Sequence, residues 1–495
     1  MVLKLPPRPP QLPSFLRRLT NEEFKPLPHT PQQTKVIAKL RAVRDDTPAR
    51  LSLPSADYWS GRQGTAAALI ELNEAYGRFY NIPPEAATDK DAADAALGRD
   101  QLVIDVQTHF IADRSPMKEW TDAMIELAVP VAGDRFRGLG KLVKEQNLAG
   151  YSLGEHLRRI YLESDTNIAV LTSAPGDESS DVPYWNGHSS ADMRMVNNAE
   201  MLGVRELIER LGGTGRLLNH SVVHPNIDSE LDKMDRWKEW CKPVGWKVYT
   251  GYGSEGGSFF KKDNLRPWSL DDDRSGTPFL QRAMETGVRT ISAHKGLSSG
   301  ADTSWNGSFS PKDVGPAAKG FPDITFLIYH SGYEPREGDQ EEGPYTEETS
   351  NYGVNRLIKS LKDAGIGAGG NVYAELGALW YMVCAHPHEA AHVMGKLLTH
   401  IGEDNIVWGT DCVFFGSPQP LIEAFRAFEI PEEYQQKYGY PALTETAKSK
   451  ILGLNAARLY RIDPDQAYAS TRNDDLAWVK AAIAEWKANG TPTHV

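Results

Sequence analysis

The segment QLVIDVQTHF, residues 101–110, joins a run of aliphatic residues to polar residues at alternate positions. A short apolar run rich in β-branched residues predicts a buried strand. Because side chains alternate between the two faces of a strand, Asp105, Gln107 and His109 are expected to point to the same side. Carboxylate and imidazole groups can bind a metal, so we expect this strand to carry chemistry at its carboxyl end.

Seven further segments have strand character, and amphipathic helical stretches such as 193–212, 354–365 and 387–402 lie between them. The strand segments are 166–174, 216–224, 245–253, 288–296, 324–332, 371–378 and 405–413. Eight alternating strand and helix units predict an α/β fold of the TIM (β/α)8 barrel type. In such barrels the chemistry lies at the carboxyl ends of the strands, so the residues that end each strand matter most.

Strand ends supply further potential metal ligands. The fifth predicted strand ends in His294, the sixth in His330 and the eighth in Asp411. Together with His109 these residues would meet at one barrel mouth. Neutral imidazole and ionised carboxylate are natural ligands of a divalent transition metal, and a catalytic site leaves one position open for water.

At these residues the sequence resembles the metal-dependent amidohydrolase superfamily, specifically amidohydrolase family 2, which includes aminocarboxymuconate-semialdehyde decarboxylase and related aromatic-acid decarboxylases. The resemblance covers roughly residues 101 to 462 and rests on IDVQTH, ISAHKG, LIYHSG, VWGTD and ILGLNAARLYRID. It implies one divalent metal, with zinc the first expectation and manganese the second. It further implies that His109, His294 and Asp411 are metal ligands and that His330 is the catalytic partner beside the metal.

Gln107 departs from the family pattern, which has histidine or, in some decarboxylases, glutamate at this position. A glutamine oxygen is neutral and a weaker donor than imidazole. Gln107 could therefore bind the metal loosely, bind it through water, or not bind it. The three strong ligands His109, His294 and Asp411 would still suffice for a catalytic metal site.

Three other residues are candidates for substrate binding. Lys247 would contact an anionic substrate or a neighbouring carboxylate, although binuclear members of the superfamily carry a carbamylated lysine on the fourth strand. His224 would line the pocket or make a structural hydrogen bond, and Tyr333 follows the sixth strand. The segment 334–348, with seven acidic residues, is expected to be a solvated loop or a lid.

The expected function is hydrolysis of a small organic acid, amide or lactone by a metal-activated water. Asp411 would take the proton of that water, and His330 would polarise the scissile carbonyl or protonate the leaving group. The alternative is nonoxidative decarboxylation of a carboxylic acid, aromatic or otherwise, with a protonated residue delivering the proton to carbon. A non-catalytic binding protein on a decayed barrel is a further alternative, suggested by Gln107.

Three motifs compete with this interpretation. HEAAH, residues 388–392, matches the helical zinc-protease motif with Glu389 as general base, but in this register the helix follows the seventh strand and lies in the outer ring. GYSLG, residues 150–154, fits a nucleophile elbow, yet Ser152 with Glu155 is better explained as a helix cap. GYGSEG, residues 251–256, fits a dinucleotide loop, but no helix is predicted after it.

Composition limits the partners and the cellular setting that the protein can have. The chain has 495 residues, a net charge of −12 and three cysteines far apart, with no apolar run near 18 residues. Nucleic-acid and membrane partners are therefore not expected, and the few cysteines point to a reducing, cytoplasmic setting. We expect a proline-rich arm and helical extension in 1–100, the barrel in 101–462 and a helical tail in 463–495. The arm could grip a neighbouring subunit in a homo-oligomer.

Overall fold

The TIM barrel predicted from the strand pattern is confirmed. The computed structural model describes residues 11–21, 28–112, 151–173, 183–185, 188–189, 195–250, 268–297, 309–335 and 341–489. Eight parallel strands pair in chain order, and each segment expected to be a strand contributes one. They are β1 (Ile104–Thr108), β2 (Ile168–Leu171), β5 (Leu217–Val222), β6 (Gly245–Tyr249), β7 (Thr290–His294), β8 (Thr325–Tyr329), β9 (Val372–Glu375) and β10 (Ile406–Val407).

Backbone hydrogen bonds close the ring between the first and last strands. The Val106 N–H donates to the Trp408 carbonyl at 3.0 Å, and the Asp411 N–H donates to the Gln107 carbonyl at 2.9 Å. The carboxyl ends of the strands therefore meet at one mouth, where side chains from distant parts of the sequence can share a site.

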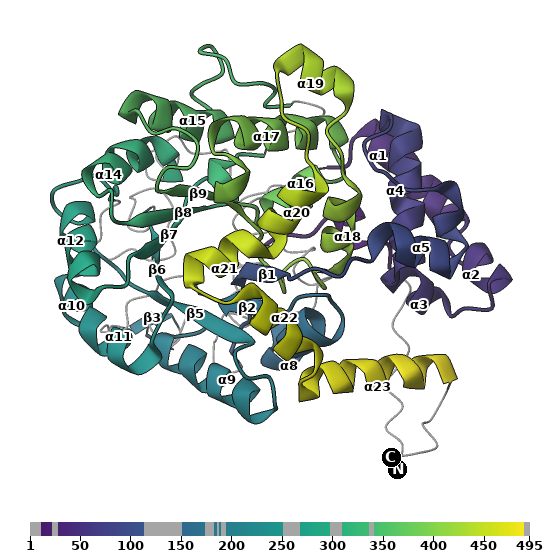
Figure 1. Cartoon of the computed structure of the whole chain (residues 1–495), viewed down its shortest axis with the longest axis horizontal. Coiled ribbons are helices and arrows are strands. Elements are labelled where there is room, and N and C mark those ends of the chain that lie inside the picture. The colour runs from purple at the N-terminus through teal and green to yellow at the C-terminus, as the bar shows by residue number, and fades with distance from the viewer. Residues whose placement is uncertain are drawn as a thin grey trace.

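Helices surround the strands (Figure 1). Those between and after the strands are α8 (Leu153–Leu157), α9 (Asn198–Arg210), α10 (Asp228–Asp232), α11 (Met234–Cys241), α12 (Gly276–Thr286), α14 (Val314–Gly320), α15 (Gly353–Ala364), α16 (Leu379–Val383), α17 (Pro387–His400), α18 (Gln419–Ala427), α19 (Glu432–Tyr438), α20 (Glu445–Ser449), α21 (Asn455–Tyr460), α22 (Pro464–Arg472) and α23 (Asp475–Asn489). A two-stranded antiparallel pair, β3 (Pro183–Trp185) and β4 (His188–Ser189), lies outside the barrel sheet. Among the helices of the described ranges, none is long and apolar enough to span a membrane.

The N-terminal extension packs against one side of the barrel. Its helices are α1 (Pro31–Ala42), α2 (Asp46–Arg50), α3 (Ser55–Ser60), α4 (Arg62–Tyr76) and α5 (Lys90–Leu97), and α4 contacts both α17 and α18. Residues 11–21 of the proline-rich arm lie on the chain's own barrel, with Phe15, Leu16 and Leu19 buried. Burying such a side chain fully contributes about 1.5–3 kcal/mol, which explains why this part of the arm is docked.

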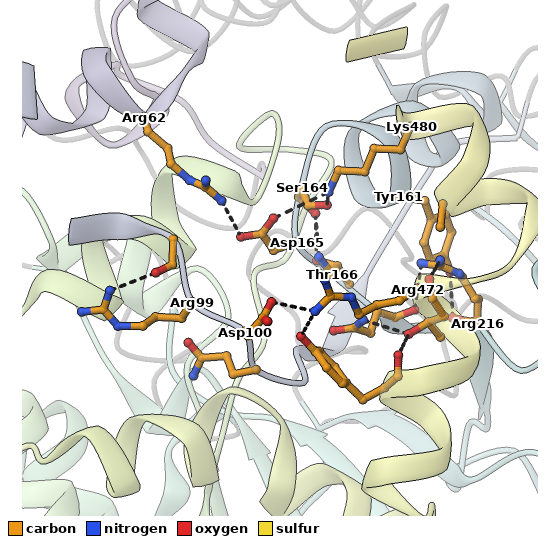
Figure 2. A pocket seen from close by; sticks show the side chains of 16 residues that line it. Arg62, Arg99, Asp100, Tyr161, Ser164, Asp165, Thr166, Arg216, Arg472 and Lys480 are labelled. Atoms are coloured by element: carbon orange, nitrogen blue, oxygen red, sulfur yellow. Dashed lines mark hydrogen bonds and ion pairs between the residues drawn. The ribbon is translucent and has the colours of Figure 1, made fainter. Parts of the chain in front are cut away.

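An ionic junction joins the extension, the barrel and the C-terminal helix. Figure 2 shows Arg62, Asp165 and Lys480 converging beside a cavity of about 480 Å³ at the amino-terminal ends of the first strands, opposite the mouth. Each basic side chain that lines this cavity has an acidic partner. The pairs are Arg62 with Asp94 and Asp165, Arg99 with Glu445, Arg216 with Asp474, Arg472 with Asp100, and Lys480 with Asp165.

His220 on β5 lies inside the barrel and has a structural role. Its Nδ1 donates to the Tyr329 hydroxyl at 2.9 Å, and its Nε2 accepts from the Tyr460 hydroxyl at 2.9 Å. Burial, with a further contribution from Lys247, lowers the pKa of His220 to about 3. The side chain is therefore neutral in the folded protein at pH values where the unfolded chain is already protonated.

This difference predicts a specific pH dependence of stability. Between pH 7 and pH 5 the unfolded chain binds a proton at His220 and the folded chain does not, so stability falls with pH. The loss from this one group is about 2 kcal/mol for an unfolded pKa near 6.5. The free energy of unfolding can be measured with urea at pH 7 and at pH 5. Its decrease between these pH values should be about 2 kcal/mol smaller in His220→Gln than in the wild type. An unchanged decrease would contradict the assignment.

Candidate active site

Strand β1 delivers Gln107 and His109 to the mouth, and both side chains are buried. The register of β1 against β2 shifts between Asp105 and Thr108, which disturbs the simple alternation of side chains. The Asp105 carboxylate accepts hydrogen bonds from the backbone N–H and the hydroxyl of Thr410. Asp105 therefore holds the loop that carries Asp411.

Asp411 lies just beyond β10, and hydrogen bonds reach its carboxylate from two sides. Its Oδ1 lies 2.9 Å from His109 Nε2 and accepts from Gln107 Nε2 at 3.1 Å. Its Oδ2 accepts from Asn21 Nδ2 at 2.6 Å. Its φ of 60° is unusual for a residue with a side chain, and such conformations cluster at functional sites.

His294 and His330 form a second pair at the mouth. His294 is the last residue of β7, and His330 directly follows β8 with a φ of 61°. His330 Nε2 lies 3.2 Å from His294 Nδ1, and the two rings meet edge to face. The strand ends thus bring together the histidines that the sequence separates by 36 positions.

Backbone carbonyls set the tautomers of both histidines. His330 Nδ1 donates to the Gly377 carbonyl at 2.7 Å, and His294 Nε2 donates to the Gly296 carbonyl at 3.1 Å. Burial lowers the pKa of His330 to about 4 and that of His294 well below its ordinary value. Both rings are neutral near pH 7, so the two nitrogens that face each other carry lone pairs.

Glu375, the last residue of β9, holds the His330 backbone. Its carboxylate accepts from the His330 N–H at 2.9 Å and from the Gly377 N–H. Burial raises the pKa of Glu375 to about 8. Glu375 is not among the residues expected from the sequence, although it ends the strand predicted in NVYAELGA, where function is expected.

Lys247 lies on β6 beside aromatic rings of the barrel interior. Its Nζ is 3.7 Å from the centre of the Tyr329 ring and 4.5 Å from that of Tyr249. The Tyr249 ring stacks on His294, with 4.5 Å between centres. Lys247 and His294 therefore contact the same aromatic ring.

The other two predicted substrate-binding residues are both buried. His224 is buried just after the end of β5. Tyr333 is buried as well, and its hydroxyl is within hydrogen-bonding reach of Glu389 on the outer helix α17. The Tyr333 hydroxyl therefore faces the outer ring of helices.

The donor set fits a divalent cation in its chemistry. His109, His294 and His330 each donate one N–H to a backbone carbonyl, as metal-binding histidines commonly do. Two lone pairs facing each other 3.2 Å apart repel unless a cation or proton accompanies them. Among the described residues, however, no three His, Cys, Asp or Glu side chains converge on one point as they stand.

Gln107 presents its amide nitrogen to Asp411. The orientation of the Gln107 amide follows from this hydrogen bond, because an ionised carboxylate can only accept hydrogen bonds and the amide nitrogen is the donor. In this orientation Gln107 would support the ligand Asp411, and its oxygen would not face the metal.

We expect a metal-loaded wild type and a depleted His294→Ala variant. Losing one of three strong ligands should weaken the affinity for manganese or zinc at least tenfold. Even residues that only orient a metal ligand typically change metal affinity by about 10–100-fold when they are replaced. Elemental analysis of both purified proteins checks this. Equal metal content in the two proteins would contradict the ligand role of His294.

The HEAAH histidines lie away from the mouth, on α17. His388 Nδ1 lies 2.6 Å from the Tyr434 hydroxyl, and His392 Nδ1 lies 3.0 Å from that of Tyr440. The Glu389 carboxylate accepts from the Glu342 N–H at 3.0 Å. These contacts are packing interactions with α19 and nearby loops.

His388→Ala and His392→Ala are therefore expected to keep metal content and activity within about twofold of wild type, because surface and packing changes far from the chemistry act mainly on stability. Thermal unfolding, metal analysis and turnover should be measured on the same samples. Loss of metal from either folded variant would support a protease site instead.

The other two competing motifs are GYSLG and GYGSEG. Ser152 caps α8, accepting from the Glu155 N–H, as expected for a helix start. Residues 251–256, which carry the GYGSEG motif, lie outside the described residues.

The chain resembles one protein family and several solved structures. The family model described as Amidohydrolase matches residues 60–462. No curated protein matches the sequence significantly. Similar solved structures include an uncharacterized TIM-barrel protein from Bordetella bronchiseptica (13% identity, TM-score 0.42, covering 72% of this chain and 98% of that chain). A second is 2,6-dihydroxybenzoate decarboxylase from Rhizobium (14% identity, TM-score 0.38, covering 73% of this chain and 99% of that chain). A third is 5-carboxyvanillate decarboxylase from Sphingomonas paucimobilis (13% identity, TM-score 0.40, covering 73% of this chain and 100% of that chain).

Proposed function

Because the chain belongs to the amidohydrolase family of enzymes, we propose that it catalyses the metal-dependent, nonoxidative decarboxylation of a small aromatic carboxylic acid. The substrate would be an anion with a ring, and the products would be carbon dioxide and the ring with hydrogen in place of the carboxylate.

The surroundings of His294 carry this proposal. The buried ammonium of Lys247 provides positive charge near His294, and both groups contact the Tyr249 ring. Phe309 meets the His294 ring edge to face, with 4.9 Å between centres. A cation among aromatic rings complements an aromatic acid in both charge and shape.

His109, His294 and Asp411 would hold the metal. When bound, a divalent cation supplies positive charge for the substrate carboxylate and a neighbouring oxygen. The residues of the chain then orient the ring and move the proton.

The proton chemistry would involve Asp411 and His330. The carbon that loses carbon dioxide must gain a proton, and Asp411, one of the carboxyl groups at the mouth, would take a proton from water and deliver it to that carbon. His330 Nε2 carries a lone pair and is held by the Gly377 carbonyl through Nδ1. It would accept a hydrogen bond from a substrate hydroxyl, which increases the electron density of the ring that is to be protonated.

Deuterium incorporation tests the reaction. Metal-free protein is loaded with manganese or zinc and incubated in D2O with hydroxybenzoic acids labelled with ¹³C at the carboxyl group. Release of labelled carbon dioxide with one deuterium on the former carboxyl carbon is expected. The matching benzamides serve as a control, since they keep the ring and lack the carboxylate.

Hydrolysis of a lactone or amide is the second candidate, and the His109–Asp411 pair favours it. A carboxylate 2.9 Å from an imidazole can accept a proton from attacking water. Turnover of lactones or amides without release of carbon dioxide would replace the decarboxylase proposal with this one.

A further inference from the structure

Residues 11–21 of the N-terminal arm reach the barrel mouth. Asn21 is buried, and its Nδ2 donates to Asp411 Oδ2 at 2.6 Å. The two residues are 390 positions apart in the sequence. The arm thus contacts a residue that the proposed function places at the centre of the chemistry.

Tyr381 on α16 holds the arm in place. Its hydroxyl accepts from the Leu19 N–H at 2.8 Å and donates to the Arg17 carbonyl at 2.6 Å. The Tyr381 ring stacks on Phe415, with 4.1 Å between centres and 17° between planes. Phe415 lies on the same loop as Asp411, so one packed unit fixes both partners of the contact.

The two oxygens of Asp411 have different partners. His109 and Gln107 contact Oδ1 from β1, whereas Asn21 contacts Oδ2 from the arm. A carboxylate held on one oxygen only can rotate about its Cβ–Cγ bond. The donor on Oδ2 prevents this rotation and keeps Oδ1 directed at His109.

We propose that Asn21 is a positioning residue for Asp411, so that the N-terminal arm forms part of the active site. The role of Asp411 in this inference rests on the proposed function. Asn21 acts through Asp411 and touches neither the metal nor the reacting carbon in this account.

A double-mutant cycle on metal affinity tests the proposal. Metal-free wild type, Asn21→Leu, Asp411→Ala and the double variant are titrated with manganese alone. Asn21→Leu is expected to weaken manganese binding about 10–100-fold, as is typical for residues that orient a ligand. In the Asp411→Ala background the same substitution should have no further effect, because the group through which it acts is gone.

Leu16→Ala is the matched control in the same arm. Leu16 is buried and packs with the arm, but it makes no contact with Asp411 among the described interactions. We expect it to lower the melting temperature and to leave manganese affinity within twofold. An equal loss of affinity in Leu16→Ala and Asn21→Leu would overturn the proposal in favour of a general folding role.

A crystal structure of Asn21→Leu provides a readout independent of the reaction. The Asp411 carboxylate should be rotated or present in more than one orientation. An unchanged Asp411 would overturn the inference whatever the enzyme catalyses. A rotated Asp411 in an enzyme that releases no carbon dioxide would retain the inference and reject the proposed function.

Discussion

His330→Gln is expected to lower kcat by about 10²–10⁴-fold, the range typical of a lost general acid or base. The glutamine side chain is neutral and of similar length, but it has no ring nitrogen to accept the hydrogen bond from the substrate hydroxyl. His330 Nε2 carries the lone pair for that bond because Nδ1 is committed to Gly377. Steady-state kinetics on a substrate found in the deuterium experiment would measure the loss.

Metal analysis separates the catalytic role of His330 from a ligand role. We expect His330→Gln to keep its metal, in contrast to His294→Ala. His220→Gln is the matched control, because His220 is also a buried barrel histidine but hydrogen bonds to Tyr329 and Tyr460 away from the mouth. A metal-free His330→Gln protein would make His330 a ligand instead.

Lys396→Met is expected to destabilise the folded protein by about 3–5 kcal/mol, the usual effect of breaking a buried ion pair. Lys396 Nζ lies 2.7 Å from Glu342 Oε1, and neither side chain is more than 1% exposed. Without the ammonium, the buried Glu342 carboxylate would lose its cationic partner and lie beside Glu389, whose pKa burial already raises to about 7. Urea unfolding of wild type and variant at pH 7 measures the change.

Lys90→Met is the control for this prediction. Lys90 also pairs with a carboxylate, Asp94, but is 76% exposed, and such surface pairs contribute about 0–1 kcal/mol. The double variant Lys396→Met with Glu342→Gln should recover part of the loss, since it removes the buried charge as well. Similar effects of Lys396→Met and Lys90→Met would contradict the importance of burial.

Glu342 also corrects the expectation for the acidic segment 334–348. The run of charge predicts a solvated loop, yet Glu342 is buried, and it accepts from the N–H groups of Val354 and Asn355 at the start of α15. Charge density along the sequence does not reveal which carboxylate has a buried partner. Lys396 lies 54 positions away, on α17.

The barrel and most of its mouth could be predicted from local patterns. Short β-branched runs between amphipathic helices predicted all eight strands, because burial on both faces of a parallel sheet demands apolar residues at nearly every position. The strand ends also identified His109, His294, His330 and Asp411, since parallel strands in a closed barrel deliver their last residues to one place.

Relations between distant segments were decided only by the tertiary structure. Asn21 lies in a proline-rich stretch that reads as an arm for another subunit, and no local pattern links it to Asp411. The orientation of the Gln107 amide and the facing lone pairs of His294 and His330 likewise depend on which carbonyls the fold places beside them. Residue type and strand position determined which groups reach the mouth, whereas packing determined how each group is turned, because hydrogen-bond direction depends on neighbours that only folding brings together.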